Sequence, residues 1–152
     1  MPVFLHCEGQ FDIDWKMYVA GRDGVIYTFR NGQQMDQIIQ IESKPIGFLR
    51  LEKTLLIAGM DNIIQSFYMK GKKNFAVTMP SEVLAITKMN THKTTKAQSN
   101  YLVALKNGEI RMYNDKHLIC KITTDDLVTG MLFGVFGREE GCLVINHKSG
   151  GL

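Results

Sequence analysis

The sequence is short of the features that mark membrane-spanning, secreted and nucleic-acid-binding proteins. Its longest apolar run, residues 127–136, is broken by Thr129, Gly130 and Gly134 and is too short to span a bilayer. The N-terminus has no basic segment followed by an apolar stretch, so no secretion signal is predicted. The 18 basic and 15 acidic residues leave a net charge of +3, which is too balanced to favour nucleic acid as a partner.

Cysteine and histidine are sparse and lack the spacing of metal ligands. Cys7, Cys120 and Cys142 lie far apart and include no Cys-x-x-Cys pair. They are predicted to be small buried apolar residues in a reducing compartment, not a disulfide or zinc framework. The four histidines show no ligand spacing either, so we expect no metal site and no cofactor.

Signatures of catalysis are also missing. The chain has no Gly-x-Ser-x-Gly elbow and no phosphate-binding loop. Acidic residues near turns usually cap backbone N–H groups or are solvated, so no enzymatic activity is predicted and no catalytic residue is assigned. The acidic residues that lie close together in sequence are Asp12 with Asp14, Asp125 with Asp126, and Glu139 with Glu140.

What the chain does contain is a recurring hairpin pattern. Residues 101–113 form a short apolar run, the dipeptide Asn107-Gly108, and then an alternation of apolar and polar residues. Asn-Gly tolerates positive φ at both central positions of a tight two-residue turn, so the segment predicts a β-hairpin. Similar segments recur along the chain, and their equivalent turn positions are Gly24, Asn62, Gly108 and Gly150.

The spacing of these turns predicts the architecture. The steps between equivalent positions are 38, 46 and 42 residues, and a period of about 40–45 residues is typical of four-stranded β-propeller blades. We therefore predict an all-β chain that forms a partial β-propeller, with about three and a half antiparallel, WD40-like blades. The units are expected at about 3–42, 46–79, 82–123 and 127–152. The propeller is expected to be incomplete at both ends, as part of a longer protein.

Several short motifs, in their order along the chain, carry a resemblance to a known family. From about residue 9 to the end, the chain resembles the Bardet–Biedl syndrome 1 family of BBSome subunits. The motifs are Gly9-Gln10-Phe11-Asp12, Pro45-x-Gly47, Lys70-Gly71-Lys72-Lys73, Asn107-Gly108-Glu109-x-Arg111-x-Tyr113, Gly137-Arg138-Glu139 and Gly150-Gly151-Leu152.

One departure from the family pattern is visible near the end. The family has a basic residue followed by three glycines, whereas this chain has Lys148-Ser149-Gly150-Gly151. A serine in a conformation of positive φ would be strained. This turn is therefore expected to change shape.

The resemblance implies a role as well as a fold. It implies later blades of an N-terminal propeller, acting as a non-catalytic scaffold within a complex that carries membrane proteins into and out of cilia. The implied partners are other BBSome subunits, ciliary membrane-protein cargo, and an Arf-like small GTPase in its GTP form. The implied location is the cytoplasm and the cilium or basal body, with an indirect, peripheral association with the ciliary membrane.

The residues expected to contact a partner lie in the fourth unit. The resemblance places the GTPase contact on the first and last blades, and the fourth unit is similar to the start of the last one. Arg138, Glu139 and Lys148 are the candidate partner-binding residues.

Two alternative functions fit parts of the same pattern. Blades of a quinoprotein-like propeller enzyme also carry Asp-Gly turns and aromatic strand ends, but they predict a tryptophan in every blade, and Trp15 is the single tryptophan here. A generic protein-interaction propeller with some other partner is the second alternative. Binding to the GTP form of the GTPase would separate it from the first hypothesis.

Overall fold

The computed structural model describes residues 1–89 and 100–152, and within these ranges the regular elements are all β-strands. Fourteen strands form three four-stranded sheets and one two-stranded sheet. All pairings between neighbours are antiparallel. The all-β prediction is therefore confirmed. In this described part, no helix has the length and apolar character needed to cross a membrane.

Each sheet is a simple meander in which strands pair in chain order. The first sheet consists of β1 (Pro2–Gln10), β2 (Asp14–Gly21), β3 (Val25–Arg30) and β4 (Gln33–Gln40). The second consists of β5 (Pro45–Arg50), β6 (Thr54–Gly59), β7 (Ile63–Tyr68) and β8 (Lys73–Thr78). The third consists of β9 (Val83–Lys88), β10 (Asn100–Leu105), β11 (Glu109–Asn114) and β12 (His117–Thr123). The last pairs β13 (Val128–Phe136) with β14 (Glu139–His147).

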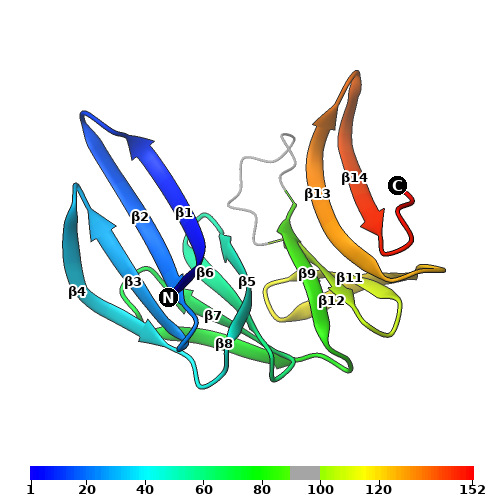
Figure 1. The fold of residues 1–152 in the computed structure, drawn as a ribbon, viewed down its shortest axis with the longest axis horizontal. Helices are drawn as coiled ribbons and strands as arrows, with labels where there is room; N and C mark the ends of the chain where they lie inside the picture. The colour runs from blue at the N-terminus through cyan, green and yellow to red at the C-terminus, as the bar shows by residue number, and fades with distance from the viewer. Residues whose placement is uncertain (90–99) are drawn as a thin grey trace.

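The sheets fan out from a common centre (Figure 1). The first strand of each sheet lies innermost, and β1 contacts β5, β5 contacts β9, and β9 contacts β13. Gly47 permits part of this close approach, because a Cβ at that position would lie 2.7 Å from the Ile86 side chain of β9. The strands β4, β8 and β12 form the outer edges. Inner first strands and outer fourth strands are the geometry of propeller blades.

The hydrophobic core is divided between neighbouring sheets. Leu55 and Ile57 of β6 face the first sheet, whereas Leu56 and Ala58 of the same strand face the third, and all four are at most 1% exposed. Alternate side chains of a strand point to opposite faces, so a strand covered on both sides must be apolar throughout. This explains the uninterrupted apolar run in β6. Burying each large side chain contributes roughly 1.5–3 kcal/mol.

The predicted hairpins are present, but their turns are one residue longer than expected. Gly108 donates its N–H to the Leu105 carbonyl oxygen at 3.1 Å and has φ 89°. Asn107 has no positive φ; its Oδ1 instead accepts the Glu109 N–H at 3.1 Å. The turn is therefore a three-residue loop whose last residue is left-handed, and the two-residue turn was wrong.

The same turn recurs in all four sheets. Its last residue is Gly24 (φ 86°), Asn62 (φ 65°), Gly108 (φ 89°) or Gly150 (φ 90°). In each case the N–H of that residue donates to the carbonyl oxygen three positions earlier, at 3.0–3.3 Å. Glycine suits this position because left-handed backbone is costly for other residues. Asn62 is tolerated because asparagine enters this region more readily than most.

A second hydrogen bond closes each of the first three sheets. The carbonyl oxygen of the last turn residue accepts an N–H from the residue that follows the outer strand. The donors and acceptors are Ile41 to Gly24 (2.9 Å), Met79 to Asn62 (2.7 Å) and Thr124 to Gly108 (2.8 Å). This hydrogen bond joins the turn between the second and third strands of each sheet to the start of the connection to the next sheet.

The turn at Ser149 keeps the common shape, so the expectation of an altered turn was wrong. The left-handed position falls on Gly150, one residue later, and Ser149 has no positive φ. Ser149 donates its backbone N–H (3.0 Å) and its hydroxyl (2.5 Å) to Asp126 Oδ2. The serine is therefore accommodated without strain, and its hydrogen bonds join the turn to Asp126 in the segment before β13.

The prediction that the cysteines are buried was also wrong. Cys7 and Cys120 are exposed, and Cys142 is partly exposed. Cys7 lies on the outward face of β1, and Cys120 lies on β12, an edge strand whose residues are all exposed. Their positions in the sheets, not their apolar character, decide their exposure.

Candidate protein interface

The candidate partner-binding residues lie on a single hairpin, β13–β14. Phe136 pairs with Glu139 at one end of the hairpin, and Val128 pairs with His147 at the other. Arg138 and Glu139 therefore lie at the tip between the two strands, whereas Lys148 follows β14 at the opposite end. At about 3.3 Å per residue, the two ends are roughly 30 Å apart. The structure thus brings Arg138 and Glu139 together and separates Lys148 from them.

The tip of the hairpin presents its charges to solvent. Arg138 and Glu139 are both exposed, and neither takes part in an ion pair with another of the described residues. Gly137, at φ 64°, supplies a left-handed conformation at the tight connection. A short turn of this kind holds two opposite charges at a defined place, which suits contact with a protein surface.

The other end of the hairpin is held by Asp126. Its Oδ1 accepts the Leu127 N–H at 2.8 Å, and its Oδ2 accepts both donors of Ser149. The Ser149 hydroxyl is the largest of the causes that lower the pKa of Asp126, followed by the backbone N–H groups. Lys148 is exposed on this fixed turn, and its own N–H donates to the Leu127 carbonyl at 2.8 Å.

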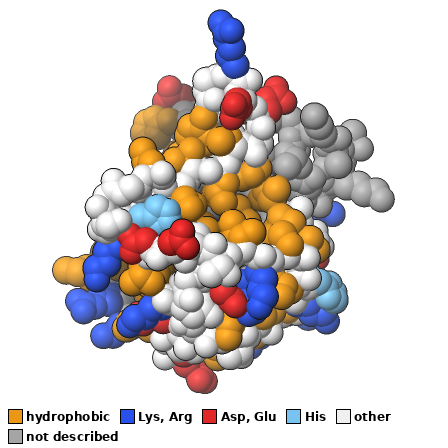
Figure 2. All heavy atoms as spheres, turned by 90° about the vertical axis from the view of Figure 1, so that its right-hand side faces the viewer, with side chains coloured by type: hydrophobic (Ala, Val, Ile, Leu, Met, Phe, Trp, Pro, Cys, Tyr) orange, Lys and Arg blue, Asp and Glu red, His pale blue; other side chains and the backbone are white. Residues whose placement is uncertain are grey.

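The hairpin also has an apolar face that was not predicted from the sequence. Leu132 is 60% exposed and Val135 is 53% exposed, whereas Met131 and Phe133 pack against the core of the third sheet. Figure 2 views the molecule from this side and shows hydrophobic side chains gathered across the upper middle of the surface. Apolar residues on both faces of β13 were the signal, because strand side chains alternate between faces.

Exposed aromatic and apolar side chains also mark the β1–β2 turn. Phe11 is 81% exposed and Ile13 is 76% exposed, and the Phe11 ring stacks on Trp15 with centroids 6.0 Å apart. Because β1 and β13 are both innermost first strands, this turn lies at the same end of the fan as Arg138. The end of the molecule that carries Arg138 and Glu139 therefore also carries apolar contact area.

Two of the acidic residues that are paired in sequence, Asp14 and Asp126, have partners within the protein. Asp14 forms an ion pair with Arg30 at 3.0 Å, and the hydrogen bond from that guanidinium lowers the pKa of Asp14. Asp126 caps a turn, as described above. Across residues 1–89 and 100–152, no group of three or more His, Cys, Asp and Glu side chains is placed to hold a metal ion.

Comparison with known proteins finds curated relatives of this chain. No family model matches the chain. The chain is 35% identical over 153 residues to the human protein "BBSome complex member BBS1" and 34% identical to the mouse protein of the same name. Both alignments cover 100% of this chain but 26% of the relative, so the chain spans about a quarter of the length of these curated relatives.

Solved structures agree with the sequence comparison. A crystal structure of BBS1N in complex with ARL6DN, soaked with mercury, superposes with a TM-score of 0.91 at 34% identity. That superposition covers 98% of this chain and 49% of the BBS1N chain. The Pan2 WD40 domain of Neurospora crassa has a TM-score of 0.63 at 13% identity and covers 78% of this chain and 38% of its own, a likeness of fold alone.

The fold and these likenesses define a set of blades from a β-propeller, as predicted. The whole of this chain is similar to part of human and mouse BBS1, and it superposes on BBS1N. The chain belongs to the BBS1 family, and it corresponds to later blades of the family's N-terminal propeller.

Proposed function

We propose that this chain acts as a non-catalytic docking segment of a BBSome-type complex, recruited by an Arf-like small GTPase in its GTP form. The observation that carries the proposal is the superposition on BBS1N, which was crystallised in complex with ARL6DN. Similarity to a "BBSome complex member" supports other BBSome subunits as further partners. On this proposal the protein traffics ciliary membrane proteins, its cargo. It works in the cytoplasm and at the cilium or basal body, and it is peripheral to the ciliary membrane.

We place the GTPase contact at the tip of the β13–β14 hairpin. Arg138 and Glu139 are exposed there and uncompensated by ion pairs within the described residues. Arginine is favoured in interfaces because its planar guanidinium forms several directed hydrogen bonds. Lys148, roughly 30 Å away, would contact a different partner or a different part of the same one.

A pull-down on an immobilised Arf-like GTPase tests the proposal. The GTP-locked GTPase should retain the protein, and the GDP form should not. Arg138→Glu should weaken retention at least tenfold, because it reverses a charge at the contact, whereas Lys148→Glu, a matched change at the far end of the hairpin, should leave retention unchanged. Equal retention by the two nucleotide forms would contradict the function. A loss confined to Lys148→Glu would contradict the placement of the contact.

A further inference from the structure

The four sheets pack against one another through matched positions. The first strand of each sheet has a β-bulge near its start. The residue after the bulge faces the following sheet, and the next residue along the strand faces the preceding sheet, because alternate side chains point to opposite faces. The residues after the bulge are Phe4, Gly47, Ala85 and Gly130.

The three contacts inside the molecule show which residues meet at these positions. An apolar side chain of one sheet packs against the residue after the bulge in the sheet before it. At Gly47 the approach is closest, since an added Cβ would lie 2.7 Å from the Ile86 side chain. The pairs that meet in this way are Phe4 with Phe48, Gly47 with Ile86, and Ala85 with Met131.

The same two positions have no counterpart at the two ends of the fan. Gly130 faces outward from β13, and a Cβ added there would have no atom of the described residues within 4 Å, apart from its chain neighbours. Leu5 is the matching residue of β1, and its side chain is 63% exposed. The strands β1 and β13 belong to opposite ends of the fan (Figure 1). Leu5 and Gly130 are thus the two halves of a contact of the kind that Ile86 makes with Gly47.

The outward face of the first sheet has the composition of a buried face. Its cross-strand row consists of Leu5, Val19, Tyr27 and Ile38. The matching row of the second sheet, which packs against the first sheet, consists of Phe48, Ile57, Gln65 and Ala76. Neither row contains a charged residue, and the outward row is the more apolar of the two.

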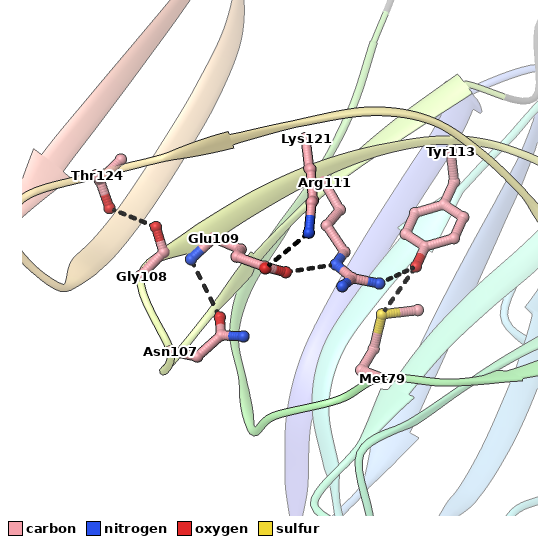
Figure 3. A network of polar contacts seen from close by, with 8 residues as sticks. All are labelled: Met79, Asn107, Gly108, Glu109, Arg111, Tyr113, Lys121 and Thr124. Carbon is pink, nitrogen blue, oxygen red and sulfur yellow. Dashed lines mark hydrogen bonds and ion pairs between the residues drawn. The ribbon is translucent and has the colours of Figure 1, made fainter.

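The matching row of the third sheet does contain charges, and these are neutralised within the sheet (Figure 3). Arg111 Nε donates to Glu109 Oε2 at 2.7 Å, and Lys121 Nζ donates to Glu109 Oε1 at 3.3 Å. Arg111 Nη1 also donates to the Tyr113 hydroxyl at 3.3 Å. A charge between sheets therefore has its own partner. The row of Leu5 needs none, so another sheet can cover it without burying an unpaired charge.

The outward face of the fourth sheet is apolar as well. Leu132 lies on the same face as Gly130, is 60% exposed, and pairs across the hairpin with the partly buried Val144. Figure 2 shows hydrophobic side chains gathered on this side of the molecule. Each end of the fan therefore presents an apolar sheet face, and one carries the side chain that the other lacks.

The extent of the chain favours a second copy as the occupant of both faces. The superposition on BBS1N covers 98% of this chain and 49% of the BBS1N chain, so two copies match nearly the length of one BBS1N chain. If a two-fold axis relates them, the fourth sheet of each copy meets the first sheet of the other. A contact between two different surfaces gives a closed ring when its rotation closes, and here two copies use all four faces.

We propose that two copies of this 152-residue chain close into a ring, in which Leu5 of each copy packs against Gly130 of the other. The ring goes beyond the docking function proposed above. It uses the outward faces of β1 and β13, whereas the proposed GTPase contact is at the tip of the β13–β14 hairpin. The two proposals can therefore fail separately.

Disulfide trapping tests which faces meet. The substitutions are made in a chain that also carries Cys7→Ser, Cys120→Ser and Cys142→Ser. A mixture of Leu5→Cys chains with Gly130→Cys chains should form a cross-linked dimer under mild oxidation, because the matched pair of the second and third sheets lies within disulfide reach. Neither variant alone should cross-link. Gly134→Cys is the matched control, since it lies about 13 Å further along β13 and should not cross-link with Leu5→Cys.

Sedimentation equilibrium tests closure and the character of the contact. The chain should reach the mass of two copies and no larger mass, because a closed ring leaves no face for a third copy. Gly130→Arg should weaken dimerisation at least about tenfold by burying an unpaired charge. Gly130→Ala should preserve it, because Ala85 occupies the matched position in the third sheet.

Four outcomes would overturn the proposal. They are a chain that stays monomeric at all concentrations, open oligomers larger than two copies, cross-linking of Leu5→Cys chains with one another, and equal effects of Gly130→Arg and Gly130→Ala. The first would leave the two faces to a different protein, and the third would mean that like faces meet.

Discussion

Single residues decide the shape of the repeated turn. The left-handed position is filled by glycine in three sheets and by asparagine in one. The side chain before it caps the turn, as Asp23, Asp61 and Asn107 do with the N–H two residues on. Substitutions at such positions therefore act through backbone strain and through the space above the turn.

Gly24→Ala tests the combined effect. Its φ of 86° is costly for alanine, and the added Cβ would overlap the Ile41 carbonyl oxygen and lie 2.9 Å from that of Ser43. We expect a loss of about 2 kcal/mol or more in the free energy of unfolding, measured by urea denaturation. Gly32→Ala is the matched control, with φ 85° and nothing within 4 Å of the Cβ. It should cost about 1 kcal/mol. Equal losses would show that the close carbonyl groups do not matter.

The lowered pKa of Asp126 predicts that the stability of the fold depends on pH. Hydrogen bonds from Ser149 and Leu127 lower its pKa in the folded state, so its ionised form stabilises the fold above the unfolded pKa, about 3.9. That stabilisation is lost as the pH falls through the lower, folded pKa. Asp126→Asn should therefore reduce the free energy of unfolding at pH 7.

The comparison with wild type gives the check. The two proteins should differ at pH 7 and converge at the acid end of a denaturation series, because asparagine resembles the protonated acid. Asp125→Asn, a neighbouring change, should alter stability little at either pH. A difference between wild type and Asp126→Asn that is constant with pH would refute the role given to the carboxylate.

At the scale of the element, hairpins were predictable and their detailed turns were not. Asn107-Gly108 is compatible with either a two-residue or a three-residue loop, and the strand register and the closing bond from Thr124 select the longer one. For the same reason, the sequence did not show that Ser149 precedes the residue of positive φ, Gly150, and is therefore not strained. Such choices depend on contacts that are distant in sequence.

The candidate interface was predictable only in part. Arg138, Glu139 and Lys148 are near in sequence, but β14 between them is extended, so they lie at opposite ends of the hairpin. The contrast between Gln65 of the second sheet and Arg111 at the matched position of the third was not predicted. That difference is present in the sequence and becomes visible when the repeats are aligned position by position.

Substitution of Tyr101 tests how β10 supports the turn between β11 and β12. Its side chain is fully buried on β10, and its hydroxyl donates to the Asp115 carbonyl oxygen at 2.7 Å. Asp115 has φ 51° in the β11–β12 turn. Tyr101→Phe should lower the free energy of unfolding by about 1–2 kcal/mol, since it leaves a carbonyl without its partner. Tyr68→Phe, on an exposed side chain, should have little effect in the same urea denaturation. Comparable losses in both variants would contradict this account.

At the scale of the whole molecule, exposed apolar side chains mark the two outward flanks of the fan. Val3 and Leu5 lie on the outward face of β1, at 46% and 63% exposure. Leu132 lies on the outward face of β13, and Val135 is exposed near the tip of the same strand. Exposed apolar side chains on the flanks of the fan favour association with another surface.

Self-association of the purified chain follows from these flanks. Analytical ultracentrifugation should show dimers whose share grows with protein concentration, and Leu132→Lys should shift the distribution toward monomer by several-fold in dissociation constant. Met60→Lys is the matched control, because Met60 is 57% exposed but lies in the β6–β7 turn. If the wild-type chain is monomeric at all concentrations, or if Leu132→Lys and Met60→Lys have equal effects, the flank is not the surface through which the chain self-associates.

The bond that joins each middle turn to the residue after its outer strand has a consequence for biosynthesis. Every group needed to seal one sheet, from Met1 to Ile41 or from Lys44 to Met79, lies within about 40 consecutive residues. A nascent chain leaving the ribosome can therefore complete one meander before the following one has been translated. The sheets would then fold in chain order, and each completed sheet would provide the surface against which the next one packs.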